Sequence, residues 1–338
     1  MIPTLLGITL VSFFLLRLAP GDAAAFRVGA EADVGARAEE LIASFRRQHL
    51  LDQPLWKQYL HYLGPFHLGE QGHAWFGGSG GEPWNGLLTG DLGNEFLRPS
   101  VSVAGELWTR LGVTLPLALI SVLLSYLLAI PLGVYAAVRR GTALETASTG
   151  VLFLLYAVPV FWAGLMLQLV FGATGLDWLP AIGLADKDAA DLSGFGRLVD
   201  TARHAVLPIV CLTYGGLAYL SRQMRVGVVE TIRADYIRTA RAKGLSELRV
   251  VWVHALRNAL IPVLTLLGQV LPVLVGGSIL VETVFDIPGM GRYAYEGLAN
   301  REYNVVMGTV LVSALLTLIG FLLSDVLYAW ADPRIRHG

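Results

Sequence analysis

Six apolar runs of roughly membrane-spanning length constrain this sequence more than any other feature. A helix needs about 20 apolar residues to cross the hydrocarbon core of a bilayer, and the first and fourth runs lie near the lower limit. Charged residues make up only 15% of the chain, against roughly 25% in a typical soluble domain. We therefore predict an all-α membrane fold with six transmembrane helices. The runs are Ile2–Leu18, Leu111–Val138, Ala147–Ala173, Ala205–Leu220, Ala255–Val281 and Val305–Trp330.

The distribution of basic residues predicts which loops face the cytoplasm. Short cytoplasmic loops are enriched in Lys and Arg, and the loop between the fourth and fifth runs carries eight basic against three acidic residues. The loop before it carries five aspartates against three basic residues and is placed outside. With six spans, both termini are then cytoplasmic. The basic residues of the fourth loop are Arg222, Arg225, Arg233, Arg238, Arg241, Lys243, Arg249 and Arg257.

The spans divide the chain into four regions. Residues 1–19 are predicted to form the first transmembrane anchor, 20–106 an external loop region, 107–330 the transmembrane domain with spans 2–6, and 331–338 a cytoplasmic tail. No basic residue precedes the first run, so we expect an uncleaved anchor instead of a cleaved signal peptide. The same absence is consistent with a true N-terminus further upstream. Within the external loop, Leu55–Leu63 has apolar residues at helical spacing.

The fourth loop is patterned as two helices joined at Gly244. Asp235–Lys243 precedes the glycine, and Ser246 is placed to cap the helix that follows. Basic residues around an apolar helical face are typical of an interfacial helix that binds anionic lipid, and equally of a helix that docks on a protein partner. The pattern alone leaves both interpretations open. The apolar face of the second helix consists of Leu245, Leu248, Val251, Trp252 and Ala255.

The residues of this loop resemble a known family. Asp235–Leu245, followed by His254–Pro262, resembles the coupling segment of ABC importer permeases. More narrowly, it is similar to the dipeptide/oligopeptide/nickel family, in the first of its two permease subunits. Further stretches resemble the same family, in the right order and over nearly the whole chain. They are Ile2–Asp22, Gly90–Gly93, Glu282–Gly291 and Asp332–Arg336.

Two departures qualify the resemblance. The general importer motif begins Glu-Ala-Ala six residues before its glycine, and here those positions are Arg238, Thr239 and Ala240. These three residues are usual at those positions in the peptide subfamily, so they point to that subfamily. The segment from Gly64 to Thr89 is longer than the family's usual link. A contact of this loop with an external binding protein is therefore not carried over.

The resemblance implies a type I ABC importer permease (MetI-like) core with a long external loop between spans 1 and 2. Such a chain forms half of the translocation pathway for peptides or related small solutes, nickel complexes and oligosaccharides among them. It is not an enzyme and holds no cofactor, because two separate ATP-binding subunits carry ATP and Mg. The residues agree, since none of the three lysines, Lys57, Lys187 and Lys243, follows a phosphate-loop glycine pattern.

The resemblance also implies the partners and the location. A second homologous permease completes the pathway, an external solute-binding protein delivers substrate, and membrane lipid surrounds the spans, with no nucleic acid involved. The chain would be a multi-pass protein of the bacterial or archaeal cytoplasmic membrane.

One segment, residues 222–257, would couple the permease to the ATPases. Small residues permit close approach, so Ala240 and Gly244 would seat a helix on the ATPase. Arg238, Arg241 and Lys243 would pair with acidic residues of the ATPase or else face solvent or lipid. The ATPase-coupling residues are then Asp235, Arg238, Ala240, Arg241, Lys243, Gly244 and Leu245.

Other residues with reactive side chains favour structural roles. The spacing of His49, His61, His67 and His73 does not place them on one helical face, so no metal site is expected. The single cysteine, Cys211, excludes an intramolecular disulfide and is expected to be a buried packing residue.

Two rival classes of protein predict features that are weak here. An ion-coupled secondary transporter predicts carboxylates or unwound helices near the bilayer centre, but the span interiors are almost free of charge, and Asp325 lies near the cytoplasmic end of the last run. A membrane-embedded enzyme predicts Ser/His or His/Glu clusters within spans. His204 and His254 lie at span ends without such a motif.

Overall fold

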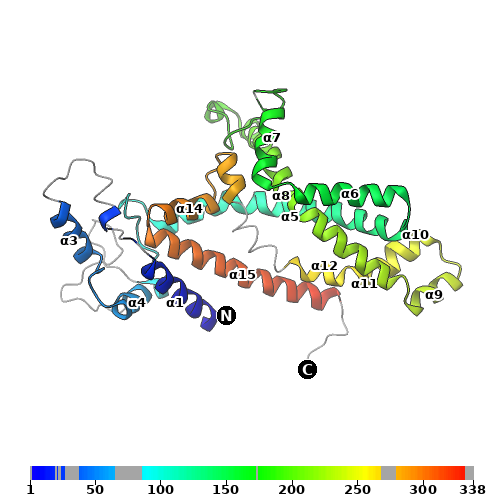
Figure 1. Cartoon of the computed structure of the whole chain (residues 1–338), viewed down its shortest axis with the longest axis horizontal. Coiled ribbons are helices and arrows are strands. Elements are labelled where there is room, and N and C mark those ends of the chain that lie inside the picture. The colour runs from blue at the N-terminus through cyan, green and yellow to red at the C-terminus, as the bar shows by residue number, and fades with distance from the viewer. Residues whose placement is uncertain are drawn as a thin grey trace. The chain divides into compact units, whose positions relative to one another are not determined.

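The computed structural model shows helices joined by loops and turns (Figure 1). Apart from one isolated β-bridge between Asn94 and Ser102, the regular elements of the described residues are helical, which confirms the all-α prediction for that part of the chain. The described residues are 2–19, 21, 24–26, 38–64, 86–172, 174–267 and 279–331. Two units can be distinguished. They are Met1–Val113 with Gly289–Leu315, and Thr114–Pro288 with Leu316–Gly338.

The first unit is built around aromatic side chains. Phe13, Tyr62, Phe96, Tyr303 and Met307 are buried together in its core. The amphipathic helix predicted at Leu55–Leu63 forms with those bounds and packs on the first helix. The helices of this unit are α1 (Ile2–Leu18), α3 (Ala38–Gln48), α4 (Leu55–Leu63), η2 (Leu87–Thr89) and α14 (Met290–Ala299), with the starts of α5 (Val103–Val138) and α15 (Tyr303–Ala331).

Buried carboxylates fix the loop that precedes α5. Glu302 accepts hydrogen bonds from the backbone N–H groups of Phe96 and Leu97, each at 2.6 Å. The Tyr293 hydroxyl donates to Glu95 Oε1 at 2.7 Å. Burial, and then this hydrogen bond, raise the pKa of Tyr293 above its ordinary value. Because buried polar groups are costly unless they are hydrogen-bonded, these contacts tie the loop to α14 and α15.

The second unit packs long helices closely. Gly133 in α5 lies so near α8 that an added Cβ would stand 2.6 Å from the Ser221 carbonyl oxygen and 2.6 Å from Met224 Cβ. Met224 and Val228 are fully buried beside this contact. Its helices are α6 (Ala143–Ala157), α7 (Val160–Phe171), η3 (Ala189–Asp191), α8 (Gly194–Thr231), α9 (Asp235–Ala242), α10 (Glu247–Arg249), η4 (Val250–Ala255), α11 (Leu256–Ala259) and α12 (Ile261–Thr265), with the remainders of α5 and α15.

Three described helices are long and apolar enough to cross a membrane, namely α5, α8 and α15 over Tyr303–Val326. The pair α6 and α7 raises the number to four if it counts as one span. Helix α1 is apolar but has only 17 residues. Residues 268–278 of the predicted fifth span lie outside the described residues. The six-span count therefore stays a prediction.

The predicted third span is not one continuous helix. Helices α6 and α7 meet at a bend of 98° around Val158 and Pro159. Proline has no N–H to donate, and its ring pushes the preceding residue out of the helical region. Val158 is accordingly extended, with φ −79° and ψ 122°.

Several predictions concern residues that the structure does not describe. Most of the long segment Gly64–Thr89 and the tail 331–338 beyond Ala331 belong here, as do His67 and His73. The predicted boundaries at 19/20, 106/107 and 330/331 stay predictions.

Candidate functional site

The segment that follows α8 is a helical hairpin turned at Gly244. Helix α8 ends at Thr231, α9 spans Asp235–Ala242, and α10 begins at Glu247. Gly244 has φ +78°, a left-handed conformation that side chains with a Cβ rarely adopt. The sequence predicted this glycine joint, and the structure has a joint at the same residue.

A small apolar core holds the hairpin together. Ile237, Val250 and Ala255 are fully buried, and Ala240 is 7% exposed. Ile232 and Leu245 pack against this core. Ala240 thus points into the hairpin, while nothing lies within 4 Å of the position that a Cβ on Gly244 would occupy.

The second arm of the hairpin departs from the predicted apolar face. The prediction assumed α-helical periodicity, but Val250–Ala255 form a π-helix, whose i→i+5 bonds change the register. Val250, Val251 and Ala255 are buried, whereas Leu248 is 74% exposed and Trp252 is also exposed. The five residues of the predicted face are therefore divided between the inside and the surface of the hairpin. The predicted side-chain cap is also absent, because Ser246 makes no capping hydrogen bond.

Charged side chains bridge the joint. Arg241 donates to Glu247 through Nε at 2.6 Å and Nη2 at 3.1 Å. These hydrogen bonds lower the pKa of the Glu247 carboxyl and raise the pKa of Arg241. Arg238 Nη1 lies 3.3 Å from Asp235 Oδ1 on the exposed side of α9. Lys243 is exposed at the end of the same helix.

A second tie joins the first arm to α11, because Asn258 Nδ2 donates to the Tyr236 hydroxyl at 2.6 Å. Exposed apolar surface lies on the same segment, at Tyr236, Leu248, Trp252 and Val253. The apolar face predicted from the sequence included Leu248 and Trp252 but not Val253. The hairpin therefore presents both basic and apolar groups to its surroundings, as a protein-docking surface does.

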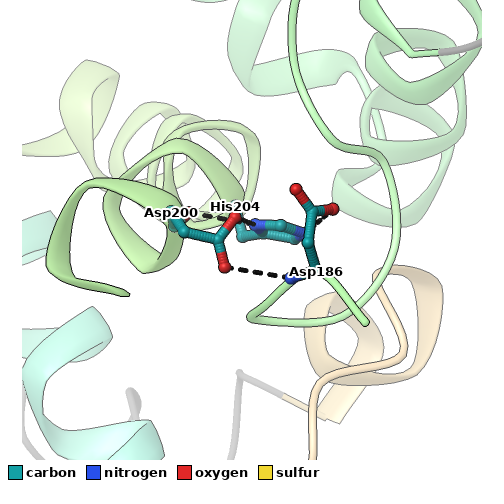
Figure 2. Close-up of side chains that lie close together, drawn as sticks. All are labelled: Asp186, Asp200 and His204. Atoms are coloured by element: carbon teal, nitrogen blue, oxygen red, sulfur yellow. Dashed lines mark hydrogen bonds and ion pairs between the residues drawn. The ribbon is translucent and has the colours of Figure 1, made fainter. Parts of the chain in front are cut away.

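A separate polar cluster lies at the start of α8 (Figure 2). The buried Asp200 carboxylate accepts the backbone N–H of Asp186 at 2.9 Å. His204 is buried between the two aspartates, with Nδ1 3.0 Å from the Asp200 carbonyl oxygen and Nε2 3.6 Å from Asp186 Oδ1. The three groups are close enough together to hold a metal ion. They also bond one another, which pins the preceding loop to α8.

The sequence placed His204 at the end of a span without a recognisable motif, and the histidines considered for a metal site lie elsewhere. His49 packs on the rings of Phe45 and Phe96, and His61 is buried in α4. Nothing in the spacing along the sequence relates Asp186 to His204, because the loop between them folds back.

Comparison with known proteins identifies relatives over the whole chain. Residues 129–337 match the family described as "Binding-protein-dependent transport system inner membrane component". The di/tripeptide transport system permease protein DppB of Pseudomonas aeruginosa is 38% identical, with 100% of this chain and 96% of that protein covered. The dipeptide permease DppB of Escherichia coli K12 is 35% identical and the oligopeptide permease AppB of Bacillus subtilis 34% identical, each over 99% of this chain and 96% of the relative.

Solved structures with a similar fold include an importer permease. A chain from the structure titled "Inward facing conformations of the MetNI methionine ABC transporter" superposes with a TM-score of 0.50 at 21% identity. The match covers 68% of this chain and 97% of that one.

Proposed function

The chain belongs to the inner membrane components of binding-protein-dependent transport systems, and from this we propose that it imports peptides as one permease subunit of an ATP-driven transporter. The observation that carries the proposal is the similarity to three peptide permeases over 99–100% of the chain. A shared fold alone would not assign a substrate.

The hairpin at residues 235–255 is the proposed contact with the ATPases. Its core of Ile237, Ala240, Val250 and Ala255 makes it one small rigid body. A rigid body transmits a push from an ATPase to α8 and α11, whereas a flexible loop would absorb it. The Tyr236–Asn258 hydrogen bond adds a second connection to α11.

Each predicted coupling residue then has a distinct position. Asp235 and Arg238 pair on the exposed side of α9, and Lys243 extends the basic surface. Arg241 is held by Glu247 across the joint, so it stabilises the hairpin as well as facing the partner. Gly244 sets the turn, and Leu245 and Ala240 pack inside.

The proposed topology has six spans with both termini in the cytoplasm. The helices α5, α8 and α15 and the bent pair α6/α7 supply four of them. Helix α1 and the predicted fifth run, Ala255–Val281, are proposed as the other two. The partners are a second homologous permease, two ATP-binding subunits that carry ATP and Mg, and an external solute-binding protein.

Affinity purification of the tagged chain from native membranes tests the assembly. The proposal expects one further permease and two copies of ATP-binding subunit to co-purify, with loss of the ATP-binding subunits when Arg238 and Lys243 are both changed to Glu. The matched control is Lys57→Glu, which reverses one charge on α4, outside the hairpin. Recovery of the tagged chain alone from gently solubilised membranes contradicts the proposal.

A further inference from the structure

A cavity of about 400 Å³ opens between α6 and the C-terminal parts of α5 and α8, of which α8 leads into the hairpin. The volume lies in the range of small-ligand sites. Its walls change in character along α6, from the hydroxyls of Ser148 and Thr149 to the side chains of Phe153 and Tyr156. Two arginines from α8, Arg222 and Arg225, stand at its polar end.

Arg225 is the central group of this polar end. Its Nη2 lies 2.8 Å from Glu145 Oε1, while its Nε is buried and finds no hydrogen-bond partner among the described residues. The Arg225 side chain as a whole is 33% exposed, so part of its guanidinium group stays accessible to a ligand in the cavity. Arg225 also lines a neighbouring cavity of about 210 Å³ with Arg140 and Glu230.

The charged side chains around the two cavities favour the binding of one anion. Across the two cavities three arginines, Arg140, Arg222 and Arg225, face two glutamates, Glu145 and Glu230. The site therefore keeps one net positive charge. Guanidinium groups bind phosphate oxygens through short, charge-assisted hydrogen bonds, and a phosphodiester carries one negative charge.

The length of the cavity along α6 suits a molecule with a polar head and an apolar tail. Ser148 and Tyr156 are about 12 Å apart along the α6 axis at 1.5 Å per residue. Phe153 is 73% exposed and Tyr156 is also exposed, although both lie within an apolar helix. Exposed aromatic rings next to a basic pocket fit an acyl chain below a headgroup.

We propose that this cavity binds the headgroup phosphate of an anionic phospholipid from the cytoplasmic leaflet, with an acyl chain along Phe153 and Tyr156. A second permease subunit fits the cavity less well, because its cytoplasmic end also carries excess Lys and Arg and would bring like charges together. Arg222 and Arg225 bind the phosphate, and Ser148 and Thr149 face the glycerol region.

Lipid binding to the purified transporter complex tests the proposal. Native mass spectrometry measures retention of phosphatidylglycerol against phosphatidylcholine after both are added at equal concentration. We expect the wild-type complex to prefer phosphatidylglycerol at least tenfold. Arg222→Gln lowers that preference about fivefold, as expected for one arginine near a lipid phosphate, and Thr149→Trp removes it by filling the cavity from an exposed position.

Arg139→Gln is the matched control, because Arg139 is exposed beside Arg140 and lines neither cavity. It leaves the preference unchanged. Arg225→Gln also leaves Glu145 unpaired, so Arg222→Gln and Thr149→Trp are the decisive variants. Equal retention of the two lipids by the wild-type complex overturns the proposal, as does an equal effect of Arg139→Gln and Arg222→Gln. Full competition by inorganic phosphate overturns the lipid assignment.

Discussion

Substitutions at Gly244 separate the folding of the hairpin from its docking. The residue has φ +78°, and an alanine there costs roughly 1–2 kcal/mol of backbone strain. That energy changes the ratio of closed to opened hairpin by roughly 5- to 30-fold. Asparagine tolerates this region better than other residues with a Cβ. We therefore expect Gly244→Asn to fold nearly as the wild type, and Gly244→Ala to open more often.

Gly244→Trp has the same backbone strain as Gly244→Ala but adds bulk on the exposed side. Beyond the adjoining residues, no atom lies within 4 Å of the added Cβ, so the indole would start from open space on the surface of the hairpin. A difference in ATPase activity between the tryptophan and alanine variants then shows whether the ATPase lies against this side of the joint. We expect membrane insertion of all three variants, partial loss of substrate-stimulated ATP hydrolysis with alanine, and near-complete loss with tryptophan.

Two measurements on the assembled complex check this series. Hydrogen exchange over residues 235–255 gives the opening of the hairpin, and ATPase co-purification gives the docking. Equal exchange in the alanine and tryptophan variants, with ATPase lost only from the second, supports the assignment. If Gly244→Trp retains the ATPases and substrate-stimulated hydrolysis at the level of Gly244→Ala, the docking role of this joint is refuted.

Three further predictions concern packing, pH and the cluster of Asp186, Asp200 and His204. Gly133→Val forces α5 away from Ser221, since even a Cβ would stand 2.6 Å from its carbonyl oxygen, and we expect a loss of several kcal/mol, measured as a lower melting temperature of the purified complex. The pKa of Glu247 is lowered in the folded protein, so its contribution is full above its unfolded value and is lost as pH falls through the folded value. The protection of the hairpin amides, corrected for the pH dependence of the intrinsic exchange rate, should fall below about pH 4.5. Glu247→Gln should abolish that fall, which stays under about 1 kcal/mol because the pair is exposed; wild-type protection that does not change with pH refutes the prediction. Asp200→Ala removes the acceptor of the Asp186 N–H, so exchange at that amide should increase, whereas a chelator should change nothing; protection that depends on a chelator would instead indicate a bound metal.

The general character of the fold was predictable because it follows from composition and periodicity. Apolar runs predicted α5, α8 and α15, and helical spacing predicted α4 with its observed bounds. The bend at Val158 and Pro159 was less predictable, because a proline in an apolar run is compatible with a mild kink as well as with a 98° break. The packing of neighbouring helices decides between a kink and a break.

The hairpin shows the same limit at the level of single residues. Gly244 was predictable, since glycine is the residue that a left-handed joint requires. The π-helix at Val250–Ala255 was not, because its hydrogen-bond register depends on the packing of Val250 and Ala255 against Ile237 across the joint. The cluster of Asp186, Asp200 and His204 likewise depends on how a loop folds back.

ATP-driven uptake in proteoliposomes tests the central claim most directly. The chain is reconstituted alone, and in parallel with the second permease and the ATPases with which it co-purifies, and uptake of a labelled dipeptide is measured with the external binding protein and ATP. We expect uptake only by the complete assembly, and its loss when the chain carries Gly244→Trp. Uptake by the chain alone, or by the other subunits without it, would show that this chain is not a permease subunit of an ATP-driven importer.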